Sequence, residues 1–240
     1  MLSVVIPAKN EQDNIAPLVK EIVTALRGVC SFEILYVDDG STDNTYHVLR
    51  QLSLSHYPQL RVIRHAFSVG QSTAVHTGVN HARGELVVTL DADGQNDPAD
   101  IPALLSAAQA YSPAQCFCVA GYRKSRKDTA WKRFQSRVAN GVRSRFLHDD
   151  TPDTGCGMKL FPRETFLRLP YFDHMHRFIP ALVKRLGGDV IVVQVNHRDR
   201  QHGTSNYTMM SRLWVGIIDM IGVLWLQKRT KIAHVVCEDE

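Results

Sequence analysis

Residues 85–98 have the sequence Glu-Leu-Val-Val-Thr-Leu-Asp-Ala-Asp-Gly-Gln-Asn-Asp-Pro. Its apolar and β-branched start predicts a buried strand, and the acidic and amide residues that follow lie at the carboxyl end of that strand. Side chains two apart in an extended backbone point the same way, so Asp91 and Asp93 can direct their carboxylates at one point. These carboxylates would repel each other without a cation, and Mg²⁺ or Mn²⁺ suits such oxygens. The alternative is an acidic loop in which Asp97 caps the next helix.

Strand and helix patterns alternate through the first half of the chain. Short connections join them as far as about Tyr111, which predicts an α/β fold with a doubly wound, mostly parallel sheet and helices on both faces. Pro7 should end the first strand, because proline has no amide hydrogen to donate. The expected strands are 2–6, 32–37, 61–64, 86–90 and 116–120, and the expected helices include 10–27 and 70–82.

Polar clusters follow four of these strands. Doubly wound sheets bind their ligands outside the carboxyl ends of the strands. The clusters should therefore line one edge of the sheet, which loop composition alone does not account for. They comprise residues 7–11, 38–43, 91–95 and 121–123.

The chain becomes basic after Arg123. Nine lysines and arginines and a single acid lie between residues 123 and 145, which fits a phosphate or membrane-surface patch or, alternatively, a solvated basic face. The polar loop 197–207 contains arginines, a glycine and hydroxyls, so it suits an anion, with a solvated loop as the alternative. We further expect a basic helix at 131–147, a glycine-containing turn into an edge strand at 154–161, helices from 162 and over 178–186, and a strand at 189–195.

Residues 209–226 form an apolar, tryptophan-containing segment followed by basic residues. Asp219 interrupts the segment, which is too short to span a bilayer. It fits an interfacial membrane helix or a subunit-contact helix of a homo-oligomer. The chain starts directly with a strand pattern and no leader, and its five cysteines show no metal-binding spacing, so we expect reduced thiols in a cytosolic protein.

The ordered set of motifs resembles the inverting nucleotide-sugar glycosyltransferases of family 2 with the GT-A fold, specifically the dolichyl- or polyprenyl-phosphate sugar (mannose) transferases. The resemblance runs from about residue 2 to about residue 226. It departs from the family at Asn206, where a lysine is common. The motifs are Val-Ile-Pro-Ala-Lys-Asn-Glu at 5–11, Val-Asp-Asp-Gly-Ser-Thr-Asp at 37–43, Gly-Gln at 70–71, Asp-Ala-Asp-Gly-Gln at 91–95, Gly-Tyr-Arg at 121–123, Ser-Arg at 136–137 and His-Arg-Asp-Arg-Gln-His-Gly-Thr-Ser at 197–205.

The resemblance implies a GT-A domain over residues 1–207, with a nucleotide-sugar half at 1–120 and an acceptor half at 121–207, and an amphipathic helix and tail at 208–240. It also implies roles for individual residues. The catalytic residues would be Asp91, Asp93 and Arg200; the nucleotide-binding residues Pro7, Ala8, Asn10, Glu11, Val37, Asp38, Asp39, Gln71 and Ala92; the acceptor- and phosphate-binding residues Arg123, Lys132, Arg133, Ser136, Arg137, Arg198 and Ser205; and the ligands of Mg²⁺ or Mn²⁺ Asp91, Asp93 and Gln95.

These roles predict transfer of a sugar from GDP-mannose or a UDP-sugar to a polyprenyl or dolichyl monophosphate. A lipid phosphate is already largely anionic at neutral pH and needs no general base. A hydroxyl acceptor would need one, for which Asp153 is the candidate. The expected partners are the nucleotide-sugar, the lipid and the inner face of the membrane, and no nucleic acid.

Two other function classes fit parts of the chain. One is a glycosyltransferase with a polysaccharide or soluble acceptor. The other is a non-catalytic nucleotide-binding protein or a receiver-like signalling protein. A receiver has about 120 residues as a rule and would leave the basic second half unexplained.

Overall fold

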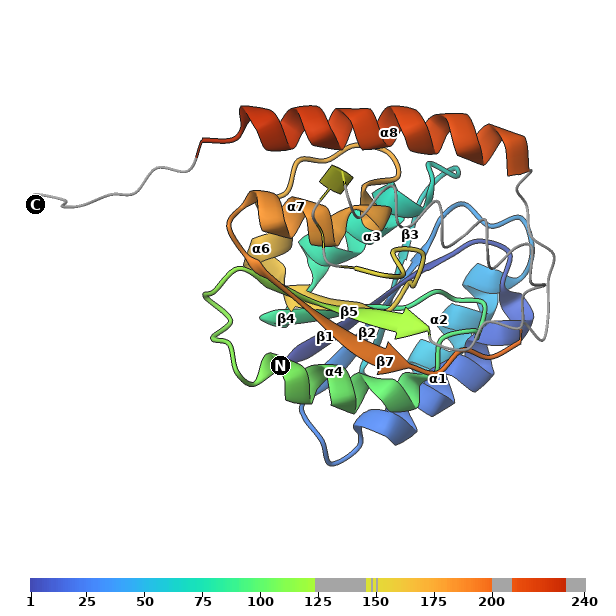
Figure 1. The fold of residues 1–240 in the computed structure, drawn as a ribbon. Helices are drawn as coiled ribbons and strands as arrows, with labels where there is room; N and C mark the ends of the chain where they lie inside the picture. Colours follow the sequence, from blue (N-terminus) through green and yellow to red (C-terminus); the bar gives the residue numbers. More distant parts are fainter. Residues whose placement is uncertain (124–145, 148, 150, 200–208, 232–240) are drawn as a thin grey trace, which may run out of the picture.

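The computed structural model describes residues 1–123, 146–147, 149, 151–199 and 209–231. Within these residues, seven strands form one sheet in the order β3-β2-β1-β4-β6-β5-β7 (Figure 1). The predicted basic helix at 131–147 and the predicted anion loop at 197–207 lie largely outside the described residues. The strands are β1 (Leu2–Ala8), β2 (Phe32–Asp38), β3 (Leu60–Arg64), β4 (Leu86–Thr89), β5 (Phe117–Arg123), β6 (Lys159–Pro162) and β7 (Asp189–Val195).

The predicted mostly parallel sheet is confirmed. β1 pairs in parallel with β2 and β4, β2 with β3, and β5 with β7. Among the strands of the described residues, β6 alone runs antiparallel to its neighbours, between β4 and β5. The prediction that it is an edge strand was wrong: β6 is buried along its whole length because it has a strand on either side.

The prediction that Pro7 ends the first strand was also wrong. β1 continues through Pro7, which pairs with Val37 of β2. The pairing of β1 with β4 stops earlier, at Val5 and Thr89. Pro7 therefore lies beyond the end of β4, where its missing amide hydrogen costs no ladder hydrogen bond to that strand.

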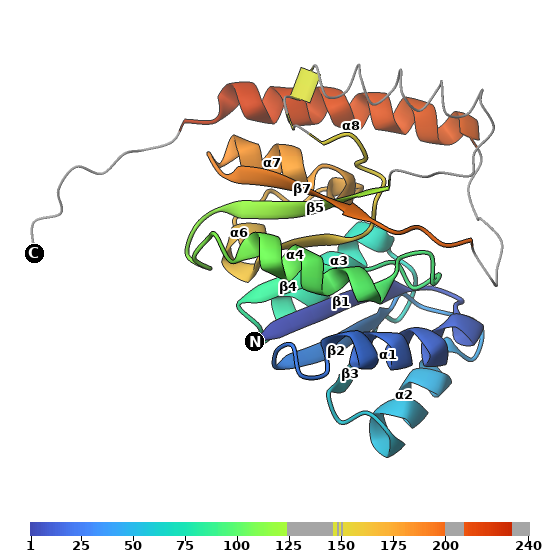
Figure 2. The ribbon, with the colours of Figure 1, turned by 60° about the horizontal axis from the view of Figure 1, so that its bottom comes forward.

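Helices cover both faces of the sheet (Figure 2). One face carries α1 (Gln12–Leu26) and α4 (Ile101–Ala108), with α2 (Thr45–Ser55) packed beside α1. The other face carries α3 (Gln71–His81), α6 (Arg163–Leu167) and α7 (Ile179–Arg185). Short 3-10 turns lie at Pro98–Asp100 (η1) and Met175–Arg177 (η2).

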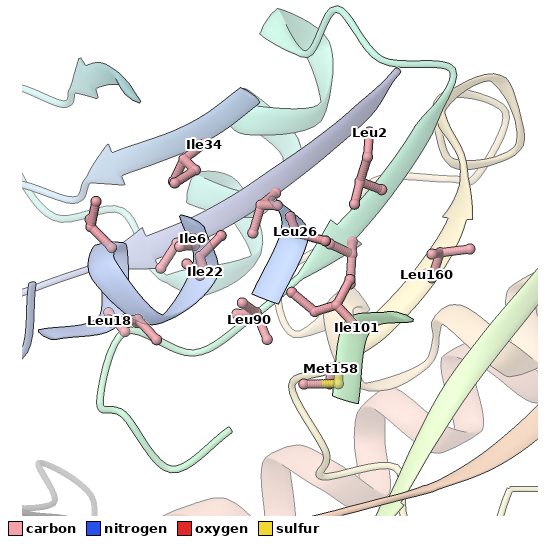
Figure 3. Packing of buried hydrophobic residues seen from close by; sticks show 14 of the residues in the cluster. Leu2, Ile6, Leu18, Ile22, Leu26, Ile34, Leu90, Ile101, Met158 and Leu160 are labelled. Atoms are coloured by element: carbon pink, nitrogen blue, oxygen red, sulfur yellow. The ribbon is translucent and has the colours of Figure 1, made fainter. Parts of the chain in front are cut away.

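The core follows from the two sequence periodicities. Alternate residues of β1 face opposite sides of the sheet, so Val4 and Ile6 join the cluster under α1 while Val5 joins the cluster under α3. α1 contributes apolar residues at helical spacing, among them Leu18 and Ile22, to the first cluster (Figure 3).

The helix α8 (Met209–Arg229) lies over α7, outside the main layers (Figure 1). Val223 on its inner side is fully buried in the second core cluster. The predicted helix over 209–226 is confirmed. None of the helices in the described part of the chain is long and apolar enough to cross a membrane.

Candidate functional site

Asp39, directly after β2, holds the loop that follows β3. Its carboxylate accepts hydrogen bonds from the backbone amides of Val69 (3.0 Å) and Gly70 (3.0 Å) and from Ser68 Oγ (2.7 Å), and His65 Nδ1 lies 2.8 Å from it. Burial acts to raise the pKa of Asp39, but these donors outweigh burial and hold the pKa below its usual range. Asp39 is therefore a stable anion whose acceptor sites are occupied by protein donors.

Asp38 is fully buried at the end of β2. Its Oδ2 atom lies 3.2 Å from Nε of Arg64, and its Oδ1 atom accepts the backbone amide hydrogen of Ser41 at 3.1 Å. Both residues of the predicted nucleotide-binding pair thus have protein partners. Their direct contact with a nucleotide stays a prediction.

The loop after β1 is joined to the loop after β2. Asn10, with a left-handed backbone (φ 55°), accepts the amide hydrogen of Thr42 on Oδ1 at 2.9 Å and donates its own amide hydrogen to Ser41 Oγ at 3.0 Å. The amide of Glu11 donates to Thr45 Oγ1 at 2.9 Å. Two of the predicted nucleotide-binding clusters therefore form one structure at the sheet edge.

Four other predicted nucleotide-binding residues lie at the same edge. The side chains of Ala8, Val37 and Ala92 are buried, so these residues can offer a ligand only backbone atoms. Pro7 is partly exposed on β1. These placements agree with a nucleotide-binding edge and leave their individual contacts a prediction.

Asp91, just after β4, has a different electrostatic environment from that of Asp39. Gln71 Nε2, on the first residue of α3, donates to Asp91 Oδ1 at 2.9 Å. Removal of the carboxylate from water and the neighbouring charge of Asp93 raise the pKa of Asp91, although Lys159, Arg123 and the Gln71 hydrogen bond oppose the shift. Among the described residues, the positive charges and the hydrogen bond near Asp91 therefore do not offset its burial and its repulsion from Asp93.

The turn after Asp91 is connected to the segment after β7. The amide of Gln95 donates to Asp93 Oδ1 at 3.1 Å, and the amide of Arg198 donates to the carbonyl of Gln95 at 3.0 Å. Gln95 Nε2 lies 3.5 Å from the carbonyl of Arg198. The side chain of Gln95 thus reaches toward the 198 segment, and its role as a metal ligand stays a prediction. Asp97 accepts the amide hydrogen of Ala99 at 3.0 Å, so it caps the turn that follows, as the alternative acidic-loop interpretation predicted.

Two predicted phosphate-binding arginines are paired with carboxylates. Arg123 at the end of β5 binds Asp153 through two hydrogen bonds, Nε to Oδ2 at 2.6 Å and Nη2 to Oδ1 at 2.8 Å. Arg198 lies 2.7 Å from Glu21 and 2.5 Å from Asp97. Their contact with a phosphate stays a prediction. The other predicted acceptor residues, Lys132, Arg133, Ser136, Arg137 and Ser205, and the predicted catalytic Arg200, lie outside the described residues.

Sequence reasoning missed three residues beside Asp91. Gly157, Lys159 and Thr89 lie where β6 approaches β4, and Thr89 Oγ1 donates to the carbonyl of Gly157 at 2.6 Å. A lysine between Met158 and Leu160 in an otherwise apolar strand was the available signal. The importance of Lys159 depends on its closeness to Asp91, 68 residues earlier in the sequence, and periodicity does not identify such a neighbour.

The two aspartates suit a divalent cation that a ligand also helps to hold. No cluster of three or more histidine, cysteine or acidic side chains that could hold a metal occurs among residues 1–123, 146–147, 149, 151–199 and 209–231. Mg²⁺, however, is commonly bound through one or two carboxylates together with substrate phosphates. Burial and the charge of Asp93 raise the pKa of Asp91, and a cation between the two carboxylates would oppose that shift.

Similar proteins share both the sequence and the fold. Undecaprenyl-phosphate 4-deoxy-4-formamido-L-arabinose transferase of Edwardsiella ictaluri is 34% identical over 87% of this chain and 63% of its own length. Dodecaprenyl-phosphate galacturonate synthase of Rhizobium johnstonii is 32% identical over 95% of this chain and 67% of its own length. The chain thus spans about two thirds of the length of these curated relatives.

A solved structure establishes the likeness of fold. Glucosyl-3-phosphoglycerate synthase from Mycobacterium tuberculosis, in complex with Mg²⁺ and UDP, superposes with a TM-score of 0.69 at 20% identity, covering 95% of this chain and 79% of the other. The predicted GT-A-like architecture is confirmed by this likeness. The family model for glycosyl transferase family 2 matches residues 3–169. With its paired aspartates at the carboxyl edge of the sheet, the chain belongs to glycosyl transferase family 2.

Proposed function

We propose that this protein transfers a sugar from a nucleotide-sugar to a polyprenyl phosphate at a membrane surface, with Mg²⁺ or Mn²⁺ held by Asp91 and Asp93. The observation that carries the proposal is the Asp91 carboxylate, which lies beside Asp93 with a raised pKa, at the sheet edge of a family 2 chain. The two curated relatives are named as polyprenyl-phosphate sugar transferases, which supports the same acceptor class.

Different residues at this edge hold different parts of the nucleotide-sugar donor. The joined loops around Asn10 and Ser41 form a wall for the nucleoside, and Asp39 shapes that wall by holding the loop at 65–70. Gln71 orients the Asp91 carboxylate toward the diphosphate. A cation bound there would act as a Lewis acid on the leaving diphosphate. Arg200 is proposed as a second positive group for the same negative charge.

The Asp153 pairing favours a phosphate acceptor over a hydroxyl acceptor. Asp153 is the candidate base for a hydroxyl, and its carboxylate is bound by Arg123 through both oxygens. A carboxylate in a bidentate pair with arginine is a weak proton acceptor, because the charge pair stabilises its ionised form. A lipid monophosphate needs no such base. We assign its binding to the basic residues between 123 and 145, including Lys132, Arg133 and Arg137, to the hydroxyl of Ser136 among them, and to the loop with Arg198 and Ser205.

The outer side of α8 fits contact with the membrane. Val215, Ile218, Ile221 and Trp225 form an exposed apolar stripe along this helix, and Ile218 is 66% exposed. Lys228, Arg229 and Lys231 follow the stripe and are exposed. An apolar face with a basic end suits an anionic bilayer surface, where each basic residue adds about 1 kcal/mol. A second copy of the chain is the alternative occupant of this stripe.

Labelled donors test the reaction. Purified protein is incubated with labelled GDP-mannose and a panel of UDP-sugars, with Mn²⁺ or with EDTA, and with polyprenyl phosphate in detergent. Label in the organic phase that requires both the metal and the lipid supports the proposal. Metal-independent transfer, or label only in a water-soluble product, contradicts it.

Vesicles test the surface of α8 separately. The change Ile218→Asp leaves the buried side of the helix intact, so it should reduce flotation with anionic vesicles about tenfold without unfolding the protein. Asp13→Asn on α1, far from the stripe, is the control. Unchanged flotation of Ile218→Asp, together with dissociation of a dimer in light scattering, would assign the stripe to a subunit contact instead.

A further inference from the structure

Lys159 is a buried cation in the middle of the sheet. It is the first residue of β6, lies between Thr89 of β4 and Ala120 of β5, and is only 3% exposed. Taking an ammonium group out of water costs several kcal/mol unless it is paired and hydrogen-bonded. The burial of a lysine at this position therefore requires a physical explanation, whereas the burial of an apolar residue of the same length would not.

The Lys159 ammonium binds the turn that enters β6. Its Nζ atom donates to the carbonyl of Cys156 and lies 3.4 Å from the carbonyl of Thr154. The same turn includes Asp153, the partner of Arg123. Lys159 thus fixes the backbone of a turn that has no regular secondary structure of its own, from residue 153 to residue 158.

Gly157 in this turn packs directly against Asp91. A Cβ atom built on Gly157 would lie 2.5 Å from Cγ of Asp91 and closer still to Oδ2. The antiparallel register of β6 with β4 explains the contact, since Lys159 opposes Thr89 and Gly157 comes two residues before Lys159 as Asp91 comes two residues after Thr89. Thr89 Oγ1 holds the carbonyl of Gly157 from the side of β4.

Thr89 and Lys159 therefore hold the turn at the point where Gly157 contacts Asp91. Thr89 fixes the Gly157 carbonyl, and Lys159 fixes the carbonyl one residue earlier. The carboxylate of Asp91 lies against the Gly157 backbone, with the Gln71 amide on one of its oxygens. Lys159 also contributes positive charge near Asp91, which opposes the cost of ionising that carboxylate.

We propose that Lys159 and Gly157 are positioning residues for the Asp91 carboxylate: Lys159 holds the turn, and Gly157 forms the surface against which Asp91 is set for a cation. This inference rests on the proposed function, because it assigns Asp91 to metal binding. Neither residue is proposed to touch the substrate. Their effect reaches the reaction through the placement of one carboxylate.

The test measures Mn²⁺ binding rather than turnover. Mn²⁺ affinity in the presence of UDP or GDP is followed by electron paramagnetic resonance, and nucleotide affinity without metal and the unfolding midpoint are measured on the same samples. Gly157→Ala and Lys159→Met should each weaken Mn²⁺ binding about 10- to 100-fold, the usual effect of removing a residue that orients a metal ligand. Metal-free nucleotide affinity should change less than twofold.

Two controls separate positioning from general damage. Gly222→Ala on α8 adds a methyl group where no atom lies within 4 Å, so Mn²⁺ affinity should stay at the wild-type value. Val183→Ala removes buried volume from α7, near Cys116, which precedes β5 at the sheet edge away from Asp91. This change should lower the unfolding midpoint without weakening Mn²⁺ binding.

The outcomes distinguish this inference from the proposed function. Wild-type protein without nucleotide-dependent Mn²⁺ binding would overturn both. Normal Mn²⁺ binding in the wild type, with equal affinity in folded Gly157→Ala, would overturn the positioning role alone. If Lys159→Met does not fold, Gly157→Ala decides the question, because it keeps the buried charge and its hydrogen bonds.

Discussion

Two aspartates at the same sheet edge, Asp39 and Asp91, lie in opposite electrostatic environments. Asp39, after β2, accepts hydrogen bonds from the amides of Val69 and Gly70 and from Ser68, and its pKa lies below its usual range. Asp91, after β4, has the Gln71 amide on one oxygen and the charge of Asp93 beside it, and its pKa is raised. Both follow apolar parallel strands.

This difference supports the proposal that Asp91, rather than Asp39, binds a cation. A carboxylate surrounded by protein donors stabilises the fold and has little left to offer a cation. A carboxylate held beside a like charge costs stability, and such a cost is typical of functional sites. At this edge, protein donors stabilise the charge of Asp39 after β2, whereas Asp91 after β4 lies beside a second carboxylate.

The largest expected effect comes from Asp91→Asn. Loss of this carboxylate should reduce metal-dependent transfer by about 100- to 1000-fold or more, because the cation that Asp91 would hold, and that would stabilise the charge developing on the diphosphate, is lost with it. The unfolding midpoint should stay equal or rise, since the change relieves repulsion with Asp93. Transfer assays and thermal unfolding on one preparation check both parts. A clear loss of stability, with transfer still fully dependent on Mn²⁺, would show instead that Asp91 stabilises the fold and does not hold the metal.

Asp39→Asn should have the opposite effects on stability and on metal binding. The amide is isosteric but presents an NH₂ group to donors such as Val69 and Gly70, so the protein should lose about 2 kcal/mol of unfolding free energy. Mn²⁺ affinity with bound nucleotide should change little. Urea unfolding gives the first quantity and paramagnetic resonance the second. A folded variant of normal stability that no longer binds nucleotide would instead make Asp39 a direct ligand.

The two carboxylates should also differ in their response to pH. The depressed pKa of Asp39 contributes stability that is present above its unfolded pKa of about 4 and is lost as the pH falls through the lower folded value. Asp91, with a raised pKa, binds protons more readily in the folded state, so its ionisation reduces stability as the pH rises above about 4.

Unfolding midpoints from acid to neutral pH check these signs. Asp39→Asn should flatten the loss of stability in acid, and Asp91→Asn should remove the loss that accompanies ionisation at higher pH. The measurements use EDTA, so that no cation occupies the carboxylates. Parallel profiles for both variants and the wild type would show that neither pKa shift contributes to folding.

The smallest expected effect concerns the ion pairs of Arg198. Its guanidinium contacts Glu21 and Asp97 but is partly exposed, so Arg198→Ala should cost about 0–1 kcal/mol of stability. If Arg198 also binds the acceptor, the KM for polyprenyl phosphate should rise severalfold while nucleotide affinity stays constant. Arg163→Ala, an arginine at the start of α6, is the matched control.

The sequence predicted the framework of the site well. The expected sheet edge is confirmed: β2 ends at Asp38, Asp91 follows β4, and both strands run parallel to β1 between them, so their carboxyl ends lie at the same edge. The error at Pro7 arose because a sequence does not reveal where a neighbouring strand stops. The error at β6 arose because an antiparallel strand inserted between β4 and β5 has no local signature.

The sequence by itself determined the strands, the helices and the aspartates that follow two of the strands. Those features depend on periodicity and on residues close together in the chain. Which aspartate is surrounded by protein donors, and which is buried without enough of them to lower its pKa, follows from the tertiary structure. That distinction depends on contacts between residues far apart in the sequence, such as Ser68 with Asp39 and Gly157 with Asp91. These contacts set the electrostatic environment of each carboxylate only after the strands have paired.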